Sequence, residues 1–476
     1  MMMFDKSREN KTNTSTAPSP ASSSFFKASS PQIIQRQPQP AAALPQRGPN
    51  PSSCFTSICD SLAKPTSSCL ADPRQCAQDF KKDVMTCLTA NAPASNATNF
   101  SEILSNTASE IDNQIDYMNG LMPDLKKAED KRQYIDWLQN FCLMKGREVW
   151  IEFNYNVVFE NVQGQRPWVY YPNDWDEIDA ALRAIPDEHL WGRSRSLPVL
   201  HFRRESFGPP SPTGSGQVGG ETDASTGLIK IFNAGVGPSP YSRSQSIGVT
   251  ATDQTIRHEV GHIVDATISR NDMDDFFQNI VQWTQHPMAW ITPHAPPYPT
   301  WQAERKSACT ELGFLDQKGN CDDTKMDSFF ASLKSGNVTM NGRLYSQNAN
   351  FLVSWPIGNV PSSTEFDYAR TSQAEYFAEL YAFAISTPAF LSASIPDAQV
   401  QWLKTHVFNT DALYKSILGP YKNLAINGNA GLMMQYQQLL NSADNMFTEQ
   451  QLKGVAAKLN LLLNQMSVPQ NNAAAV

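Results

Sequence analysis

Apolar and polar positions follow a helical period over the first structured part of the chain. Between residues 54 and 146, apolar residues recur three and four positions apart with charged residues between them, which is typical of amphipathic helices. The pattern predicts three helices, at 73–90, 100–119 and 122–144. We therefore expect a small helical domain over 54–146, which also holds six of the eight cysteines.

The period changes to that of short strands after this region. Four runs rich in β-branched and aromatic residues predict strands, at 149–153, 156–159, 197–202 and 228–232. A helix is expected between them at 174–184. Short strands mixed with helices indicate an α+β domain, which we place at 147–410. The segment 411–476 returns to apolar residues at helical spacing and is expected to pack on that domain as a helical segment.

The first 53 residues follow neither period. They are rich in Pro, Ser, Gln and Ala, and they hold eight of the chain's 32 prolines. Such a composition supplies too little apolar surface to fold alone, so 1–53 is expected to be a disordered leader. The apolar pairs Phe25-Phe26 and Ile33-Ile34 stand out in it as candidates for short docking motifs. A plain solvated tail is the alternative.

Charge and hydropathy narrow the class of protein. The chain has 476 residues, 41% apolar content, a formal net charge of -8 and a pI near 5.5, and its positive charges are scattered. A nucleic-acid-binding surface requires clustered basic residues, so no nucleic-acid partner is expected. No apolar run reaches the roughly 18 residues that a membrane span needs. The start MMMFDKSREN lacks the apolar core of a signal peptide, so neither a membrane span nor ordinary secretion is expected.

The cysteines are unevenly spaced and leave two chemistries open. Five lie between residues 54 and 87, Cys142 stands alone, and Cys309 and Cys321 flank a short polar segment. The absence of a C-x2-C pair argues against a structural zinc site. Disulfides, including a loop closed by Cys309 and Cys321, would suit an exported protein, whereas a cytosolic chain would keep buried thiols.

The most informative short motif is H-E-x-x-H, formed by His258, Glu259 and His262. Residues four apart on a helix are neighbours on one face, with about 5–6 Å between Cβ atoms. Both imidazoles can therefore reach one ion at about 2.0–2.1 Å. Glu259 would lie beside the metal, where its carboxylate can take a proton from water and pass it to a leaving amine. Chance occurrence on an ordinary amphipathic helix is the alternative, so a second signal is required.

A catalytic zinc needs a third protein ligand, and candidates lie on a helix further along the chain. Thr371 or Ser372 is a suitable N-cap for this helix, which is expected to end near Ser386. Glu375 and Glu379 are four apart and share one face, which also borders aromatic residues. Two carboxylates that face a core need a partner. The alternative is an ordinary surface helix, on which both carboxylates would be solvated.

These two windows resemble a known type of metallopeptidase. HEVGHIVD at 258–265 and YARTSQAEYFAELYAF at 368–383 are similar to the catalytic domain of the anthrax lethal factor type of gluzincin. The chain around the two windows matches only loosely. The resemblance implies one catalytic Zn²⁺ and a zincin-type domain with a small mixed sheet, an active-site helix and a helical C-terminal subdomain.

Carried over residue by residue, the resemblance implies that the zinc ligands are His258, His262 and Glu375. Glu259 would be the catalytic base. The choice of Glu375 over Glu379 rests on its spacing from a tyrosine, so an exchange of the two stays open.

Three further roles follow from the same resemblance. Tyr368 would lie across the metal, where its hydroxyl stabilises an oxyanion or protonates the leaving group. Glu379 would orient a ligand histidine, and Asp265 could play a similar part. The strand at 228–232 is expected to be the sheet edge that pairs with an extended peptide.

The remaining histidines of this region are not expected to bind the metal. His189 is expected to be structural. His286 and His294 are expected to lie in a packed connecting loop.

The leader resembles the N-terminal segments of bacterial proteins associated with extracellular contractile injection systems. The similarity rests on Phe25-Phe26, on Ile34-Gln35-Arg36-Gln37 and on the proline-rich stretch after them. It implies synthesis in the bacterial cytoplasm without a signal peptide, association with such a particle, and delivery outside the producing cell or into a target cell.

Together these patterns predict a zinc-dependent endopeptidase that acts on a protein substrate as a toxin or effector. A non-catalytic structural or adaptor component of a secretion particle is one alternative, and a zinc hydrolase of a small amide or peptidoglycan link is another. The presence of both Glu259 and Tyr368 favours a working enzyme.

Overall fold

The computed structural model describes residues 52–91, 100–160, 172–190, 197–205, 208–210, 218–236, 249–292, 299–334, 336–348, 351–422, 424 and 430–467. These residues form a mixed α+β protein, as predicted, in which helices surround two four-stranded sheets. The leader predicted at 1–53 lies outside them, apart from residues 52 and 53, and stays a prediction.

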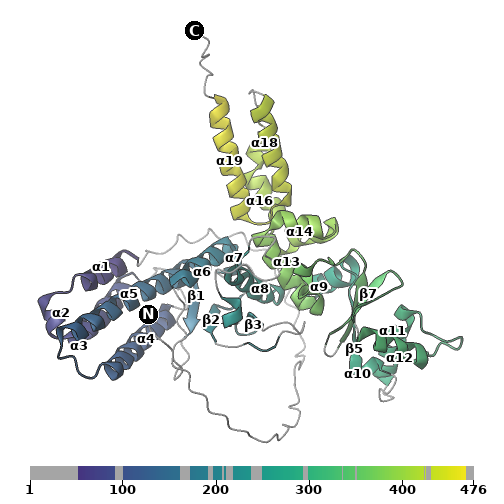
Figure 1. Ribbon diagram of the computed structural model, residues 1–476. Coiled ribbons are helices and arrows are strands. Elements are labelled where there is room, and N and C mark those ends of the chain that lie inside the picture. The colour runs from purple at the N-terminus through teal and green to yellow at the C-terminus, as the bar shows by residue number, and fades with distance from the viewer. Residues whose placement is uncertain are drawn as a thin grey trace, which may run out of the picture. The chain divides into compact units, whose positions relative to one another are not determined.

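The first helices of the chain pack together around their own apolar core (Figure 1). They are α1 (Ser52–Ala63), α2 (Ser67–Ala71), α3 (Pro73–Ala90), α4 (Phe100–Leu121) and α5 (Ala128–Tyr155). Asp72 caps α3 by accepting a hydrogen bond from the Gln75 backbone N–H, and Pro73 occupies the first turn, where no donor is needed. The helices predicted at 73–90 and 100–119 are confirmed.

The strand predicted at 149–153 is wrong, because α5 continues through it. A short run that is apolar at nearly every position can be a buried strand or a buried helix, and periodicity alone does not separate them. The helical signal lies in the polar residues Lys145, Glu148 and Glu152, whose spacing of three and four brings their buried side chains together. The domain boundary expected between 146 and 147 consequently falls inside α5.

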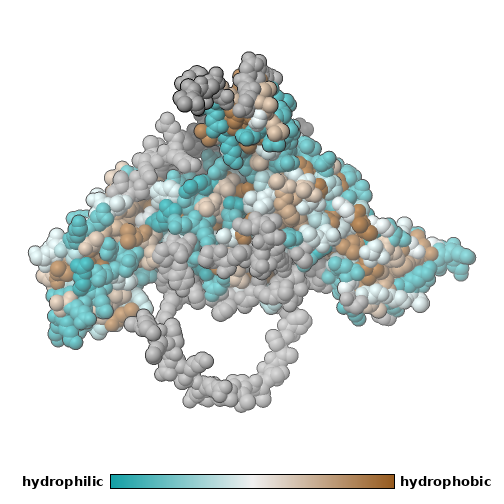
Figure 2. All heavy atoms as spheres, turned by 45° about the horizontal axis from the view of Figure 1, so that its top comes forward, coloured by the Kyte–Doolittle hydropathy of each residue, from teal (hydrophilic) through white to brown (hydrophobic). Residues whose placement is uncertain are grey.

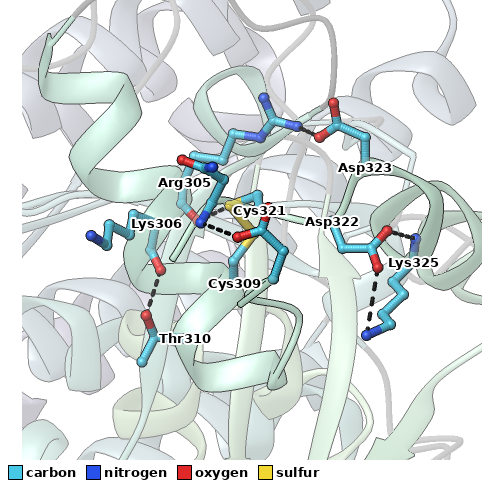
Figure 3. Close-up of a disulfide and its surroundings, with 10 residues drawn as sticks. Arg305, Lys306, Cys309, Thr310, Cys321, Asp322, Asp323 and Lys325 are labelled. Atoms are coloured by element: carbon cyan, nitrogen blue, oxygen red, sulfur yellow. Dashed lines mark hydrogen bonds and ion pairs between the residues drawn. A yellow bond between two sulfur atoms is a disulfide. The ribbon is translucent and has the colours of Figure 1, made fainter. Parts of the chain in front are cut away.

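All eight cysteines form disulfides, so the structure favours this alternative over buried thiols. The pairs are Cys54–Cys87, Cys59–Cys142, Cys69–Cys76 and Cys309–Cys321. The first three hold the helices α1, α2, α3 and α5 to one another. The fourth closes the loop expected from its spacing, beside an ion pair between Arg305 and Asp323 (Figure 3).

The first sheet has the order β1-β2-β4-β3. Its strands are β1 (Val157–Glu160), β2 (Leu200–Arg204), β3 (Gly220–Asp223) and β4 (Leu228–Ile231). β1, β2 and β4 are parallel, while β3 runs antiparallel to β4 at the edge. The prediction that 228–232 forms the sheet edge is therefore wrong. β3 covers that edge, and its sequence G-E-T-D has no apolar pattern that would have revealed a strand.

Two helices that lie between β1 and β2 in sequence, and one that follows β4, share an apolar core with the first sheet. They are α6 (Pro172–Ala184), α7 (Asp187–Leu190) and α8 (Ala251–Asp265), with a 3-10 turn η1 (Asn233–Gly235) after β4. α8 contacts β3, β4 and α6. Buried residues of these elements, including Phe202, Ile229 and Val260, belong to the largest apolar core of the protein.

A second sheet, fully antiparallel, lies between α8 and the later helices in sequence. Its order is β5-β8-β7-β6, from β5 (Thr284–Pro287), β6 (Val338–Met340), β7 (Arg343–Asn348) and β8 (Phe351–Pro356). A separate apolar core joins it to α10 (Met288–Ile291), α11 (Pro299–Leu312) and α12 (Asp323–Leu333). α9 (Arg270–Asp275) and the π-helical turn η2 (Phe276–Ile280) lead into it. His286 therefore lies on strand β5 rather than in the connecting loop expected for it.

The remaining helices begin with α13 (Gln373–Ser386), which is almost entirely buried. The elements around and after it are η3 (Thr364–Phe366), η4 (Ala369–Thr371), α14 (Pro388–Ser394), α15 (Asp397–Trp402), η5 (Leu403–Val407), α16 (Thr410–Ile417), α17 (Gly419–Lys422), α18 (Ala430–Ser442), η6 (Ala443–Asn445) and α19 (Glu449–Ser467). α18 and α19 lie side by side as a helical hairpin (Figure 1). Gln451 of α19 donates hydrogen bonds to the carbonyls of Ala384 and Ile385, which ties this hairpin to the end of α13.

The described helices show no candidate for crossing a bilayer, since none is both long enough and apolar enough. On the face shown in Figure 2, apolar residues are interspersed with polar ones over these helices.

A buried polar network in the second sheet makes part of the stability depend on pH. The Glu311 carboxylate accepts hydrogen bonds from His286, Ser354 and Thr284. Arg343 Nε lies 3.3 Å from Glu311 Oε1. Burial alone would raise the pKa of Glu311, but the bonds with His286 and Ser354 and the charge of Arg343 lower it to about 2. The ionised carboxylate therefore stabilises the fold above its unfolded pKa of 4.5, and this contribution is lost as pH falls toward 2.

We expect Glu311→Gln to lower the unfolding temperature at pH 6, because the amide cannot replace the carboxylate charge beside Arg343. The difference from the unmodified chain should shrink as pH falls from 4.5 toward 2. The difference in unfolding temperature is measured by thermal unfolding in the presence of a chelator, so that release of a bound metal does not contribute to it. Glu449→Gln, at a Glu449–Lys453 pair on α19, is the control. A difference that stays constant over this pH range would contradict the assignment.

Candidate metal centre

The close crossing of α8 and α13 builds the centre. A Cβ atom added to Gly261 of α8 would lie 3.0 Å from the Cα of Ala378 and 3.2 Å from its carbonyl oxygen. Two small residues at the contact allow the helix backbones to approach each other closely. The first turn of α13 is thereby brought beside the middle of α8.

α8 presents the two histidines of H-E-x-x-H as the motif predicts. Thr250 caps the helix by accepting a hydrogen bond from the Asp253 backbone N–H, and most of the following residues are buried. His258 and His262 lie one turn apart with their Nε2 atoms separated by 3.1 Å. The rings meet edge to face, with centroids 4.8 Å apart. Both Nε2 atoms therefore face the same point.

Glu375 completes this group from the first turn of α13. Ser372, one of the two caps that the sequence allowed, is the N-cap and accepts a hydrogen bond from the Glu375 backbone N–H at 3.2 Å. Glu375 Oε2 lies 2.8 Å from His258 Nε2 and 3.4 Å from His262 Nε2. Ligands at about 2.0–2.1 Å from a tetrahedral zinc are about 3.3 Å apart, so the donor set fits such an ion. Within the described residues these three side chains form one group able to hold a metal.

Glu379 lies on the other side of the same imidazole. Its Oε1 is 3.6 Å from His258 Nδ1, and its Oε2 accepts a hydrogen bond of 2.6 Å from Gln254 Nε2. Glu375 thus faces the Nε2 side and Glu379 the Nδ1 side, which separates the two carboxylates whose exchange the sequence left open. Gln254 was not singled out from sequence. The feature of the sequence that could have identified Gln254 is its position one turn before His258, on the same face of α8.

Glu259 is 4% exposed and is held by the edge strand of the first sheet. Its Oε2 accepts a hydrogen bond of 2.6 Å from Thr222 Oγ1. Burial raises the pKa of Glu259, while the nearby His258 and His262 act in the opposite direction. The carboxylate is therefore placed next to both histidines without joining the group that could hold a metal.

Tyr368 lies beside the centre, just before η4. Its ring centroid is 5.6 Å from that of His258, and the Tyr368 carbonyl accepts hydrogen bonds from the backbone and hydroxyl of Thr371. The structure thus brings this tyrosine to His258, which also contacts Glu375 and Glu379.

Asp265 ends α8, three residues after His262. Burial raises the pKa of Asp265 to about 6, against the opposing charge of His262. In the described part of the chain, no hydrogen bond joins its carboxylate to His258 or His262. The orienting role expected for it therefore has no direct contact to support it.

Charges around His258 also suit a cation. Burial lowers the pKa of His258, but its hydrogen bond with Glu375 and the charges of Glu379, Glu375 and Glu259 raise it to about 9. The pKa of Glu375 is lowered by the same pairing, which outweighs its burial. Three carboxylates thus converge on two imidazoles in a largely buried place. A buried set of this kind needs a compensating positive charge, which a divalent ion can supply.

The other histidines named from sequence have different partners. His189 is fully buried, with Nδ1 2.9 Å from the Tyr381 hydroxyl and Nε2 3.2 Å from the Val407 carbonyl, which is the structural role predicted. His286 lies between Glu304 and Glu311. His294 lies outside the described residues.

The crossing at Gly261 can be tested by filling it. We expect Gly261→Val to destabilise the protein by about 1–3 kcal/mol, because overpacking forces α8 and α13 apart. Gly454→Ala in α19 is the matched control, since a Cβ atom there meets nothing within 4 Å and helix propensity favours alanine. Chemical denaturation measures both. A Gly261→Val protein as stable as the unmodified chain would contradict the packing described.

Comparison with known proteins gave no match, whether the chain was set against protein families, curated proteins or solved structures.

Proposed function

We propose that the protein is a zinc-dependent endopeptidase of the gluzincin type, similar to the anthrax lethal factor catalytic domain. The observation that carries the proposal is the convergence of His258, His262 and Glu375, with Glu259 next to them. The donor types suit zinc, since two imidazoles and one carboxylate leave a position open for water or substrate. A structural zinc site would be closed by a fourth protein ligand.

Each side chain of the centre has a defined task in the proposed reaction. A zinc ion held by the three ligands supplies Lewis acidity, which activates water and polarises the scissile carbonyl. Glu259 accepts the proton of the attacking water on its carboxylate and delivers it to the leaving amine. Tyr368 donates a hydrogen bond from its hydroxyl to the oxyanion that develops on the former carbonyl oxygen. Glu379 fixes the orientation of the His258 ring through Nδ1.

The edge strand β3 is the element suited to bind an extended peptide. It pairs with β4 on one side and ends the strand order of the first sheet on the other. A peptide can add there as a further strand through backbone hydrogen bonds. β3 also contacts Glu259 through Thr222, so a peptide paired with it would lie next to the proposed base. The sequence predicted peptide pairing for the strand at 228–232, which is β4, and the proposal assigns it to β3 instead.

Delivery outside the producing cell is the second part of the proposal. Four disulfides are consistent with a protein that matures or acts in an oxidising environment. We propose that the protein is a bacterial toxin or effector that associates with a contractile injection particle through residues 1–53. Residues 1–51 lie outside the described structure, so the role of this segment rests on the sequence resemblance.

The catalytic proposal predicts that metal binding and cleavage can be separated by substitution. Glu259→Gln should keep near one zinc per chain but lose about 10²–10⁴-fold in cleavage rate, because it removes the base and not a ligand. Glu375→Gln should lose both cleavage and bound zinc, because it removes a ligand. Glu379→Gln should retain zinc with an affinity lowered about 10–100-fold. Elemental analysis and cleavage of a mixed protein pool measure these effects.

The outcomes distinguish the alternatives. An unmodified chain without zinc would contradict the metal centre. Zinc in the unmodified chain, with no cleavage of any protein in the pool, would favour the adaptor component or a hydrolase of small amides.

The delivery proposal predicts that deletion of residues 1–53 prevents loading into the particle while zinc content stays unchanged. Particles purified from cells that express the full or shortened chain can be probed for the protein. Retained loading of the shortened chain would contradict a loading signal in the leader.

A further inference from the structure

Thr222 occupies the centre of the edge strand and faces α8. Along β3 the exposure alternates, with Gly220 buried, Glu221 exposed, Thr222 half-buried and Asp223 exposed. Thr222 pairs across the sheet with Ile229, a fully buried residue of the main core. Alternation along a strand therefore directs Gly220 and Thr222 toward α8, and the two acidic residues away from it.

The Thr222 hydroxyl is bonded to Glu259 in particular. Oγ1 lies 2.6 Å from Glu259 Oε2 and 3.3 Å from the Glu259 backbone carbonyl. The hydroxyl has one proton, and the shorter contact to a charged acceptor is the stronger of the two. Thr222 thus fixes one oxygen of the carboxylate that the proposed function makes the base.

Gly220 defines the other side of the same carboxylate. A Cβ atom at Gly220 would lie 2.5 Å from Glu259 Oε1 and 2.7 Å from its Cγ. Any side chain at this position would displace the Glu259 side chain. Two residues of the edge strand therefore define the place of the Glu259 carboxylate. Thr222 donates a hydrogen bond to Oε2, and Gly220 leaves the space that Oε1 occupies.

From this geometry we propose that Thr222 is a positioning residue, whose hydroxyl holds Glu259 in the orientation that transfers the proton. The inference rests on the proposed peptidase function. A hydrogen bond donated to Oε2 leaves Oε1 as the oxygen that accepts the proton from water and releases it to the amine. Because Thr222 belongs to the strand that pairs with the peptide, one element orients both the substrate and the base.

Variants at Thr222 separate positioning from a structural role. Thr222→Val keeps the shape of the side chain and removes the hydroxyl, whereas Thr222→Ser keeps the hydroxyl. Thr226→Val, at an exposed threonine in the turn of the same hairpin, is the matched control. Each variant is made in the full zinc-loaded chain, and zinc content, unfolding temperature, kcat and KM are measured on a peptide that the unmodified chain cleaves.

We expect Thr222→Val to lower kcat about 10–100-fold with little change in KM, zinc content or unfolding temperature. Thr222→Ser should restore most of the rate, and Thr226→Val should match the unmodified chain. A Thr222→Val protein with unchanged kcat would overturn the inference. So would a Thr222→Ser protein as slow as Thr222→Val, or a loss that follows the unfolding temperature.

A crystal structure of Thr222→Val keeps the test independent of activity. If the unmodified chain binds zinc and cleaves nothing, the proposed function fails while the position of Glu259 can still be compared. Displacement of the Glu259 carboxylate in Thr222→Val, with its place retained in Thr222→Ser, supports the inference. A carboxylate in the same place in both variants overturns it.

Discussion

The candidate centre depends on the close crossing of α8 and α13 at Gly261 and Ala378. α8 alone can present two imidazoles on one face, but two donors do not make a catalytic metal site. The third donor comes from a residue 117 positions away, and it reaches the histidines because nothing larger than hydrogen stands at Gly261. The surrounding aromatic residues of α13 fill the core on either side, so the approach of the two backbones is fixed by packing as well as by the absence of a side chain.

Hydrogen bonds and polar contacts then fix the orientation of the polar side chains around this crossing. Glu379 approaches His258 from the Nδ1 side and is itself held by Gln254, while Thr222 holds Glu259 from the sheet. Each of these buried carboxylates has a partner, which is what keeps a polar group in an apolar core from being prohibitively costly. Elements from three parts of the chain therefore converge on a few atoms: the edge strand β3, α8 and α13.

The rest of the molecule is organised in cores separate from the one that holds the centre. The first five helices share an apolar cluster tied by three disulfides, the second sheet packs with α11 and α12 around the fourth, and α16 to α19 form a further cluster. Seven of the eight cysteines belong to the first two of these clusters, and the eighth, Cys69, is bonded to Cys76 of the first. None belongs to the candidate centre. The candidate centre is thus held together by close packing and hydrogen bonds, whereas the disulfides stabilise the other regions.

Local spacing along the chain was enough to place His258, Glu259 and His262 on one helix, because side chains four apart on a helix share a face. It also narrowed the cap of α13 to Thr371 or Ser372, of which the structure has Ser372. Contacts between distant segments had no such signature. Tertiary structure decided that Glu375 and Glu379 face opposite sides of His258, that Gln254 and Thr222 support the centre, and that Cys59 pairs with Cys142. It also decided that α5 runs through 149–153 and that β3 forms the sheet edge. A short apolar run suits either a buried helix or a buried strand, and a polar strand such as G-E-T-D exists only because β4 offers it a partner.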